Sequence, residues 1–227
     1  MKRKPIKPLL RAAYKTLYGL HLRSYETYQP VIGNSGTTDG TRECGTRWQA
    51  IDAVLTEHDC HSFLDLGCSE GYYVRQAAER GLKFCVGVDF DLRRMWTCQS
   101  QVILNDLQNV SFLMSEVTPE LVTSLPRFDC VIFLSVLHHI MYEKSAEYAR
   151  EIICGLAKQT NKVMIFETGQ SDEHLESWAK KIPDMGSDPH AWIAEYLRSA
   201  GFSHVEKIGE TSSYAQEVNR AMFKAVP

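Results

Sequence analysis

The feature that most constrains the fold is an alternation of apolar runs with helical patterns, beginning near residue 62. Four of the predicted strands are continuous apolar runs, which is typical of parallel strands buried on both faces by helices. The spacing of apolar residues between the runs predicts helices. The predicted strands are 62–67, 84–90, 110–115, 128–136 and 162–168, and the helices between them end near Arg80, Leu104 and Lys158.

The C-terminal part departs from this rhythm. A helix is predicted over 189–200, ending at Gly201, a residue that commonly stops helices. Two further strands, 203–209 and 219–226, follow with only a short connector, which predicts an antiparallel hairpin at the sheet edge. We therefore expect an α/β fold: a seven-stranded, mostly parallel Rossmann-like sheet with an antiparallel terminal hairpin and helices on both faces.

The N-terminal part is basic. Residues 1–25 hold seven Lys or Arg and no acidic residue, so the remainder carries a net charge of −10 against −3 for the whole chain. Apolar residues within it recur at helical spacing, and a polar, glycine-rich loop follows over 29–48. We expect a basic helix and flexible loop over 1–45, then one domain over 46–227.

The basic helix is open to three interpretations: contact with an anionic membrane, contact with nucleic acid, or packing on its own domain. No apolar run is long enough to cross a bilayer, and no secretory signal is visible. Seven scattered cysteines without a C-x-x-C pair indicate a reducing compartment and no zinc or other metal site. These features predict a cytoplasmic location, with peripheral contact at the inner membrane surface as one possibility.

A glycine turn follows the first predicted strand in the sequence "FLDLGCSEG". Gly67 and Gly71 are four residues apart, which is neither the dinucleotide fingerprint G-x-G-x-x-G nor a P-loop. Asp65 precedes the turn, where a carboxylate repels a pyrophosphate but suits a ligand that bears an ammonium group. Alternatively, Asp65 only caps the next helix and the glycines only shape the turn.

Two later strand ends extend the pattern. Asp89 ends the second predicted strand 22 residues after Gly67, where a carboxylate can accept both hydroxyls of a ribose. Phe90 follows it and is placed to contact an adenine. Glu116 follows the third strand and is placed to approach the adenine amino group. A ligand with ribose, adenine and ammonium but no phosphate is S-adenosylmethionine.

The order of "FLDLGCSEG", "VGVDFD", "FLMSEV" and "FDCVIFLSVLHHI" resembles the class I S-adenosylmethionine-dependent methyltransferases over residues 60–225. The resemblance implies seven strands ending in a reversed hairpin. Ser69 stands where many members have a middle glycine. The resemblance assigns Asp65, Gly67 and Gly71 to the methionine moiety and Asp89 to the ribose. We also expect Ser69, Phe90, Glu116 and Ser135 to bind the cofactor.

"FLDLGC", "LSVLHHI" and "MIFETGQ" also resemble methyltransferase domains of bacterial surface-polysaccharide gene clusters, of the O-antigen chain-terminating type. This narrower resemblance implies O-methylation of a saccharide or sugar phosphate. The alternatives are an RNA (tRNA) methyltransferase, a small-molecule or natural-product methyltransferase, and a catalytically silent cofactor-binding protein.

The acceptor side is less clearly marked. His138 and His139 follow the fourth strand, at the edge where ligands bind, and either is a candidate general base. Alternatively, His139 packs beneath the cofactor and His138 orients the backbone. The candidates for contact with the acceptor are Arg42, Arg47, Tyr72, Glu167, Gln170 and His190.

Overall fold

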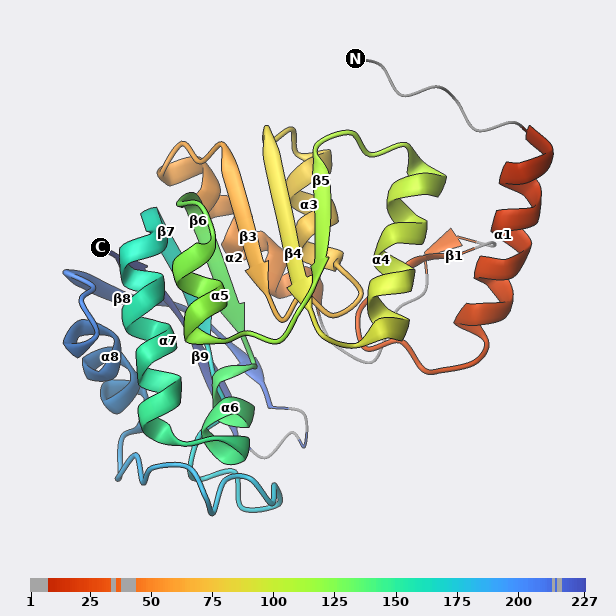
Figure 1. The fold of residues 1–227 in the computed structure, drawn as a ribbon. Helices are drawn as coiled ribbons and strands as arrows, with labels where there is room; N and C mark the ends of the chain where they lie inside the picture. The colour runs from red at the N-terminus through yellow and green to blue at the C-terminus, as the bar shows by residue number, and fades with distance from the viewer. Residues whose placement is uncertain (1–7, 34–35, 38–43, 214, 216–217) are drawn as a thin grey trace.

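A computed structural model describes residues 8–33, 36–37, 44–213, 215 and 218–227. A seven-stranded sheet in the order β5-β4-β3-β6-β7-β9-β8 dominates it (Figure 1). The strands are β3 (Ser62–Leu66), β4 (Phe84–Asp89), β5 (Val110–Met114), β6 (Phe128–Leu134), β7 (Thr160–Glu167), β8 (His204–Ser212) and β9 (Asn219–Val226).

Five parallel strands meet an antiparallel pair. Strand β3 is the middle one of the five parallel strands and pairs with both β4 and β6, while β9 runs antiparallel between β7 and β8. The predicted seven strands and the terminal hairpin are confirmed, with β8 as the outer strand. Edge strand β5 is only partly buried, which agrees with its being the predicted parallel strand without a continuous apolar run.

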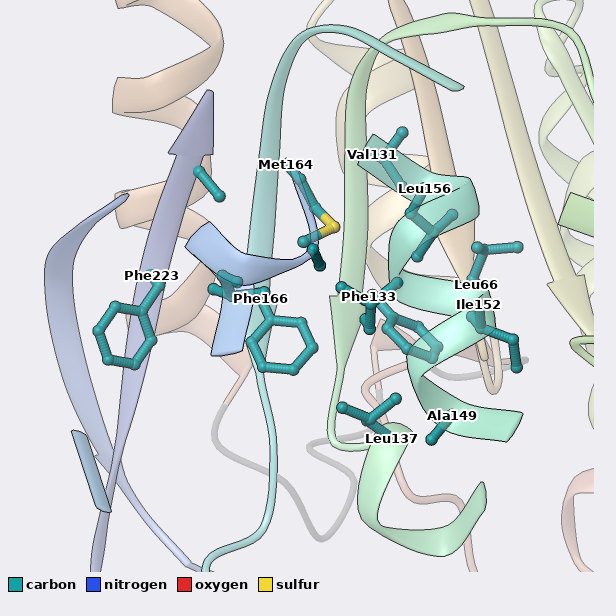
Figure 2. Packing of buried hydrophobic residues seen from close by; sticks show 14 of the residues in the cluster. Leu66, Val131, Phe133, Leu137, Ala149, Ile152, Leu156, Met164, Phe166 and Phe223 are labelled. Atoms are coloured by element: carbon teal, nitrogen blue, oxygen red, sulfur yellow. The ribbon is translucent and has the colours of Figure 1, made fainter. Parts of the chain in front are cut away.

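Helices cover both faces of the sheet, as expected for parallel strands. The buried side chains of α2, α3 and α4 pack on one face, and those of α5, α6, α7 and α8 pack on the other. Figure 2 shows this second core, in which Phe133 and Phe166 from adjacent strands lie beside Ile152 and Leu156 of α7. The helices are α1 (Pro8–Leu22), α2 (Cys44–Glu57), α3 (Tyr72–Glu79), α4 (Leu92–Asn105), α5 (Pro119–Ser124), α6 (Leu137–Glu143), α7 (Ala146–Gln159) and α8 (Pro189–Ser199).

The basic N-terminal helix lies against the domain. Helix α1 packs on α4, which separates it from the sheet (Figure 1). Tyr14, Tyr18 and His21 of α1 all contact the ring of Trp96. The sequence did not predict α5, α6 or the short pair β1 (Ile32–Gly33) and β2 (Gly36–Thr37). In the described part of the chain, no helix is both long and apolar enough to cross a membrane.

Candidate active site

The glycine turn joins β3 to α3 in a left-handed backbone. Gly67 and Gly71 have φ of 79° and 77°. A Cβ atom at Gly67 would lie 2.4 Å from Val136 Cγ2, and one at Gly71 would lie 2.7 Å from Phe112 Cζ. Both positions therefore require glycine for conformation and for space. The turn brings the start of α3 close to the carboxyl ends of β3 and β4.

Ser69 also adopts a left-handed φ, 52°, at a cost on the order of 1 kcal/mol for a residue with a side chain. Its N–H donates to Asp89 Oδ2 at 2.8 Å, and its hydroxyl donates to Glu70 Oε2 at 2.6 Å. These bonds hold a serine at the position where the resembling family has glycine.

Two carboxylates lie beneath the turn in different environments. Asp89 accepts from the N–H groups of Ser69 and Asp91, and these bonds offset part of the rise in its pKa that burial causes. Asp65 is 2% exposed, and its Oδ2 has no hydrogen-bond partner among the described residues. Burial, followed by repulsion from Asp89, raises the pKa of Asp65 well above its usual range. A cationic ligand at Asp65 would relieve both effects.

A cavity of about 570 Å³ opens beside these carboxylates at the carboxyl ends of the parallel strands. A smaller cavity of about 30 Å³ adjoins it and is lined by Asp65 and Arg47. Tyr28, Gly67, Leu134 and Ser135 line both cavities. The larger cavity is also lined by Ser69, Asp89, Phe90, Arg94, Ser115, Glu116, Val117, Val136, His138, His139, Ile140, Glu143, Lys144, Tyr148, Glu176, Trp178 and Arg220.

The chain before α2 contributes to this site. The N–H groups of Tyr28 and Gln29 donate to the fully buried Glu70 carboxylate at 3.1 and 3.0 Å. The Gln29 side chain accepts from the N–H of Tyr72 at 2.9 Å, in the first turn of α3. The glycine turn is therefore fastened to residues 28–29, some forty positions earlier. Sequence reasoning missed this contact, because Tyr28 and Gln29 lie between the basic helix and the domain, where no regular pattern marks them.

The two histidines occupy different positions at the start of α6. His138 is buried, and its Nδ1 accepts from the N–H of Gly169 at 2.9 Å. The neutral ring therefore carries its proton on Nε2. His139 is exposed on the cavity wall and makes no ring hydrogen bond within the described residues. Desolvation, and then the charge of Arg220, lowers its pKa. His139 is thus the better placed of the two to accept a proton.

Arg220 on β9 was not predicted, because it lies within a strand pattern. Its Nε and Nη2 donate to the two carboxylate oxygens of Glu173, each at 2.7 Å. Its guanidinium lies 5.6 Å from the ring centre of Trp178, and the Trp178 ring lies 4.3 Å from that of His138. The planar groups thus form one packed wall of the cavity.

Arg47 and Glu167, both predicted to contact the acceptor, bind each other. Arg47 Nε donates to Glu167 Oε2 at 2.9 Å, and Nη2 donates to Oε1 at 3.0 Å. Ser135 Oγ also donates to Glu167, at 2.6 Å. Side chains only 3% and 0% exposed need an opposite charge nearby, which explains the pairing.

The other predicted site residues fall into those that line the larger cavity and those that line neither cavity. Gly67, Ser69, Asp89, Phe90, Glu116, Ser135, His138 and His139 line the larger cavity. Tyr72 packs edge-on against Tyr73, while Gln170 and His190 both bond to the Asn219 carbonyl. These three, like Gly71, line neither cavity. Arg42 lies outside the described residues.

Residues 63–159 match the family model described as a methyltransferase domain. The chain carries a methyltransferase domain. This agrees with the methyltransferase enzyme that the sequence motifs predicted. The matched segment runs from β3 to the end of α7 and holds the glycine turn, both aspartates and both histidines.

Similar proteins extend the match beyond this segment. The O-antigen chain terminator bifunctional methyltransferase/kinase WbdD of Escherichia coli is 28% identical over 209 residues, which is 87% of this chain and 27% of WbdD. A solved structure of WbdD superposes with a TM-score of 0.75 and 26% identity, over 91% of this chain and 40% of that one. The chain thus spans well under half of these relatives.

The N-terminal domain of EvdMO1, solved with SAH and D-fucose, has a TM-score of 0.67 at 16% identity. The superposition covers 93% of this chain and 96% of the EvdMO1 domain. At this identity the likeness shows a shared fold, which includes the seven-stranded sheet described above.

Proposed function

We propose that the chain transfers a methyl group from S-adenosylmethionine to an oxygen of a saccharide or sugar phosphate, as a step in surface glycan biosynthesis. The observation that carries the proposal is the unpartnered Asp65 carboxylate at the floor of the glycine turn. Buried carboxylates are costly without an opposite charge, so this one favours a ligand that brings a cation.

The residues present fit S-adenosylmethionine. Asp65 would hold its ammonium group, and Asp89, oriented by two backbone N–H groups, would accept the ribose hydroxyls. Phe90 is 70% exposed and lines the cavity, where it offers a flat face to an adenine. When bound, this cofactor supplies an electrophilic methyl group on a positively charged sulfur.

The remaining cavity wall suits a polar, hydroxyl-rich acceptor. It mixes two carboxylates, Glu143 and Glu176, with the cations of Lys144 and Arg220 and the aromatic ring of Tyr148. Carboxylates accept hydrogen bonds from sugar hydroxyls, and the Lys144 ammonium suits an acceptor that also bears phosphate, whereas Arg220 is already paired with Glu173. WbdD acts on O-antigen chains by its name, and the EvdMO1 domain was solved with a sugar. Both relatives support a glycan acceptor.

His139 would act as the general base for a hydroxyl acceptor. As the acceptor oxygen gains the methyl group, its proton passes to the His139 ring, which a lowered pKa keeps neutral near pH 7. His138 would instead position the backbone, because its Nδ1 already accepts from Gly169. A phosphate acceptor carries no proton at the reacting oxygen, so His139 would then matter little.

The location proposed for this activity is the cytoplasm. All seven cysteines are free thiols, and six are buried, which supports a reducing compartment. Peripheral contact with the inner membrane surface through residues 1–25 stays part of the proposal and depends on a separate surface, described below.

The test has two stages. Calorimetry with S-adenosylmethionine and its demethylated product is expected to show binding that Asp65→Asn weakens. Labelled methyl transfer is then compared among a neutral oligosaccharide, the same sugar phosphorylated, and tRNA. Label on either sugar supports the proposal. Binding without transfer to any acceptor would favour a silent cofactor-binding protein, and label on tRNA alone would overturn the glycan assignment.

A further inference from the structure

Helix α1 has two apolar faces, and among the described residues one of them packs on α4 while the other is exposed. Tyr14 and Tyr18 pack on Trp96, and Arg11 bonds to the Leu104 carbonyl, so this face belongs to the contact with α4. The spacing of these three residues, three and four apart, places them along one side of the helix.

A second row of residues lies next to this face, about 100° away around the helix axis. Leu10, Leu17 and Leu20, with Ala13 between them, recur at spacings of three and four. The leucines are 62%, 57% and 56% exposed, and Leu9 beside them is 85% exposed. The tyrosines, and not this leucine row, pack on Trp96 of α4. We call Leu9, Leu10, Ala13, Leu17 and Leu20 the leucine face of α1.

The N-terminal segment that contains the leucine face carries charge of one sign. Residues 1–25 carry seven basic side chains and no acidic one, whereas the rest of the chain has a net charge of −10. Lys15 and Arg23 are exposed on or just after the helix. A surface that binds this segment must therefore combine an apolar layer with negative charge. An anionic lipid headgroup layer has both properties.

We infer that the leucine face of α1 is a docking surface for an anionic membrane, with α1 lying in the plane of the interface. A second copy of the chain is the other possible occupant, but it would bring two segments of high positive charge together, which costs free energy. The acidic body of the protein would then face away from the lipid. This inference is independent of the methylation proposal.

The experiment uses the full chain and sedimentation with vesicles. Vesicles of neutral phosphatidylcholine are compared with vesicles that also contain phosphatidylglycerol. The chain is expected to pellet with the anionic vesicles and to be released by high salt. A triple variant, Leu10→Gln, Leu17→Gln and Leu20→Gln, is expected to bind about tenfold more weakly or worse.

The matched control is Leu175→Gln, because Leu175 is 76% exposed and lies in the loop before α8, far from α1 in the sequence. It should bind vesicles like the unchanged chain. Far-ultraviolet circular dichroism and Tm should be alike for all three proteins, since the replaced side chains are exposed. Three results would overturn the inference: no binding by the unchanged chain, equal binding by the triple variant, or a dimer that only the triple variant dissociates.

Discussion

The guanidinium of Arg47 and the carboxylate of Glu167 form a buried ion pair that ties the second turn of α2 to the end of β7. Replacing Arg47 by Met would leave Glu167 charged and fully buried, so we expect the free energy of unfolding to fall by about 3–5 kcal/mol. Urea denaturation measures this loss.

The control for this variant is Arg198→Met, which removes an exposed pair with Glu195 whose side chains are 47% and 72% exposed. It should cost less than about 1 kcal/mol. If Arg47→Met also costs less than about 1 kcal/mol, the pair does not support the fold in the way that its burial suggests.

Asp89→Asn tests the ribose site. An amide accepts with one atom where the carboxylate accepts with two, so a charge-assisted hydrogen bond is lost. At about 1.5–3 kcal/mol for such a bond, the affinity for S-adenosylmethionine should fall about 10- to 100-fold. Calorimetry measures it, with the exposed Glu120→Gln on α5 as a control of equal charge change. Unchanged affinity would place the ribose elsewhere.

Asp65 predicts a pH dependence of stability. Its folded pKa is raised by burial and by Asp89, whereas the unfolded side chain titrates near 3.8. Above 3.8 the unfolded chain releases this proton while the folded chain keeps it, so stability falls as pH rises toward the folded pKa. Asp65→Asn should remove that loss. Denaturation across pH 4–8 without ligand checks it, and parallel curves for both proteins would refute it.

His139→Gln tests the general base. With a hydroxyl acceptor, the rate should drop about 10²- to 10⁴-fold. The activity of the unchanged enzyme should rise with pH through a value below the ordinary pKa of histidine, since desolvation and Arg220 lower the pKa of His139. His138→Gln removes the acceptor of the Gly169 N–H. We therefore expect it to shift the backbone at Gly169 and to leave this pH profile in place. A flat profile in the unchanged enzyme would argue for a phosphate acceptor.

Much of the fold could be predicted because parallel strands that are buried on both faces appear in the sequence as continuous apolar runs. Runs such as Val131–Phe133 are apolar at every position, since helices cover both faces. The residues predicted to bind the cofactor could be singled out because Gly67 and Asp89 are separated by a turn, a helix and a strand of ordinary lengths.

The residues of the proposed acceptor region were harder to predict, because they come from elements that are distant in the sequence. Trp178 lies in an irregular segment and Arg220 within a strand, so neither stands out until the sheet brings β7 and β9 together. Arg47 and Glu167 were singled out for their charge, but sequence alone does not show that they neutralise each other across 120 positions. Local pattern reveals burial and turns, whereas pairing between distant side chains requires the tertiary structure.

The bond from Glu70 to the backbone of residues 28–29 has a practical consequence for trimming the protein. A chain shortened to residues 63–159, which the family model matches, or begun at residue 46, would lack the N–H groups of Tyr28 and Gln29. The buried Glu70 carboxylate would then lose two of its hydrogen-bond donors. Such fragments should express as aggregates. Tyr28 and Gln29, which line the cavities beside the glycine turn, are therefore as much a part of this site as the turn itself.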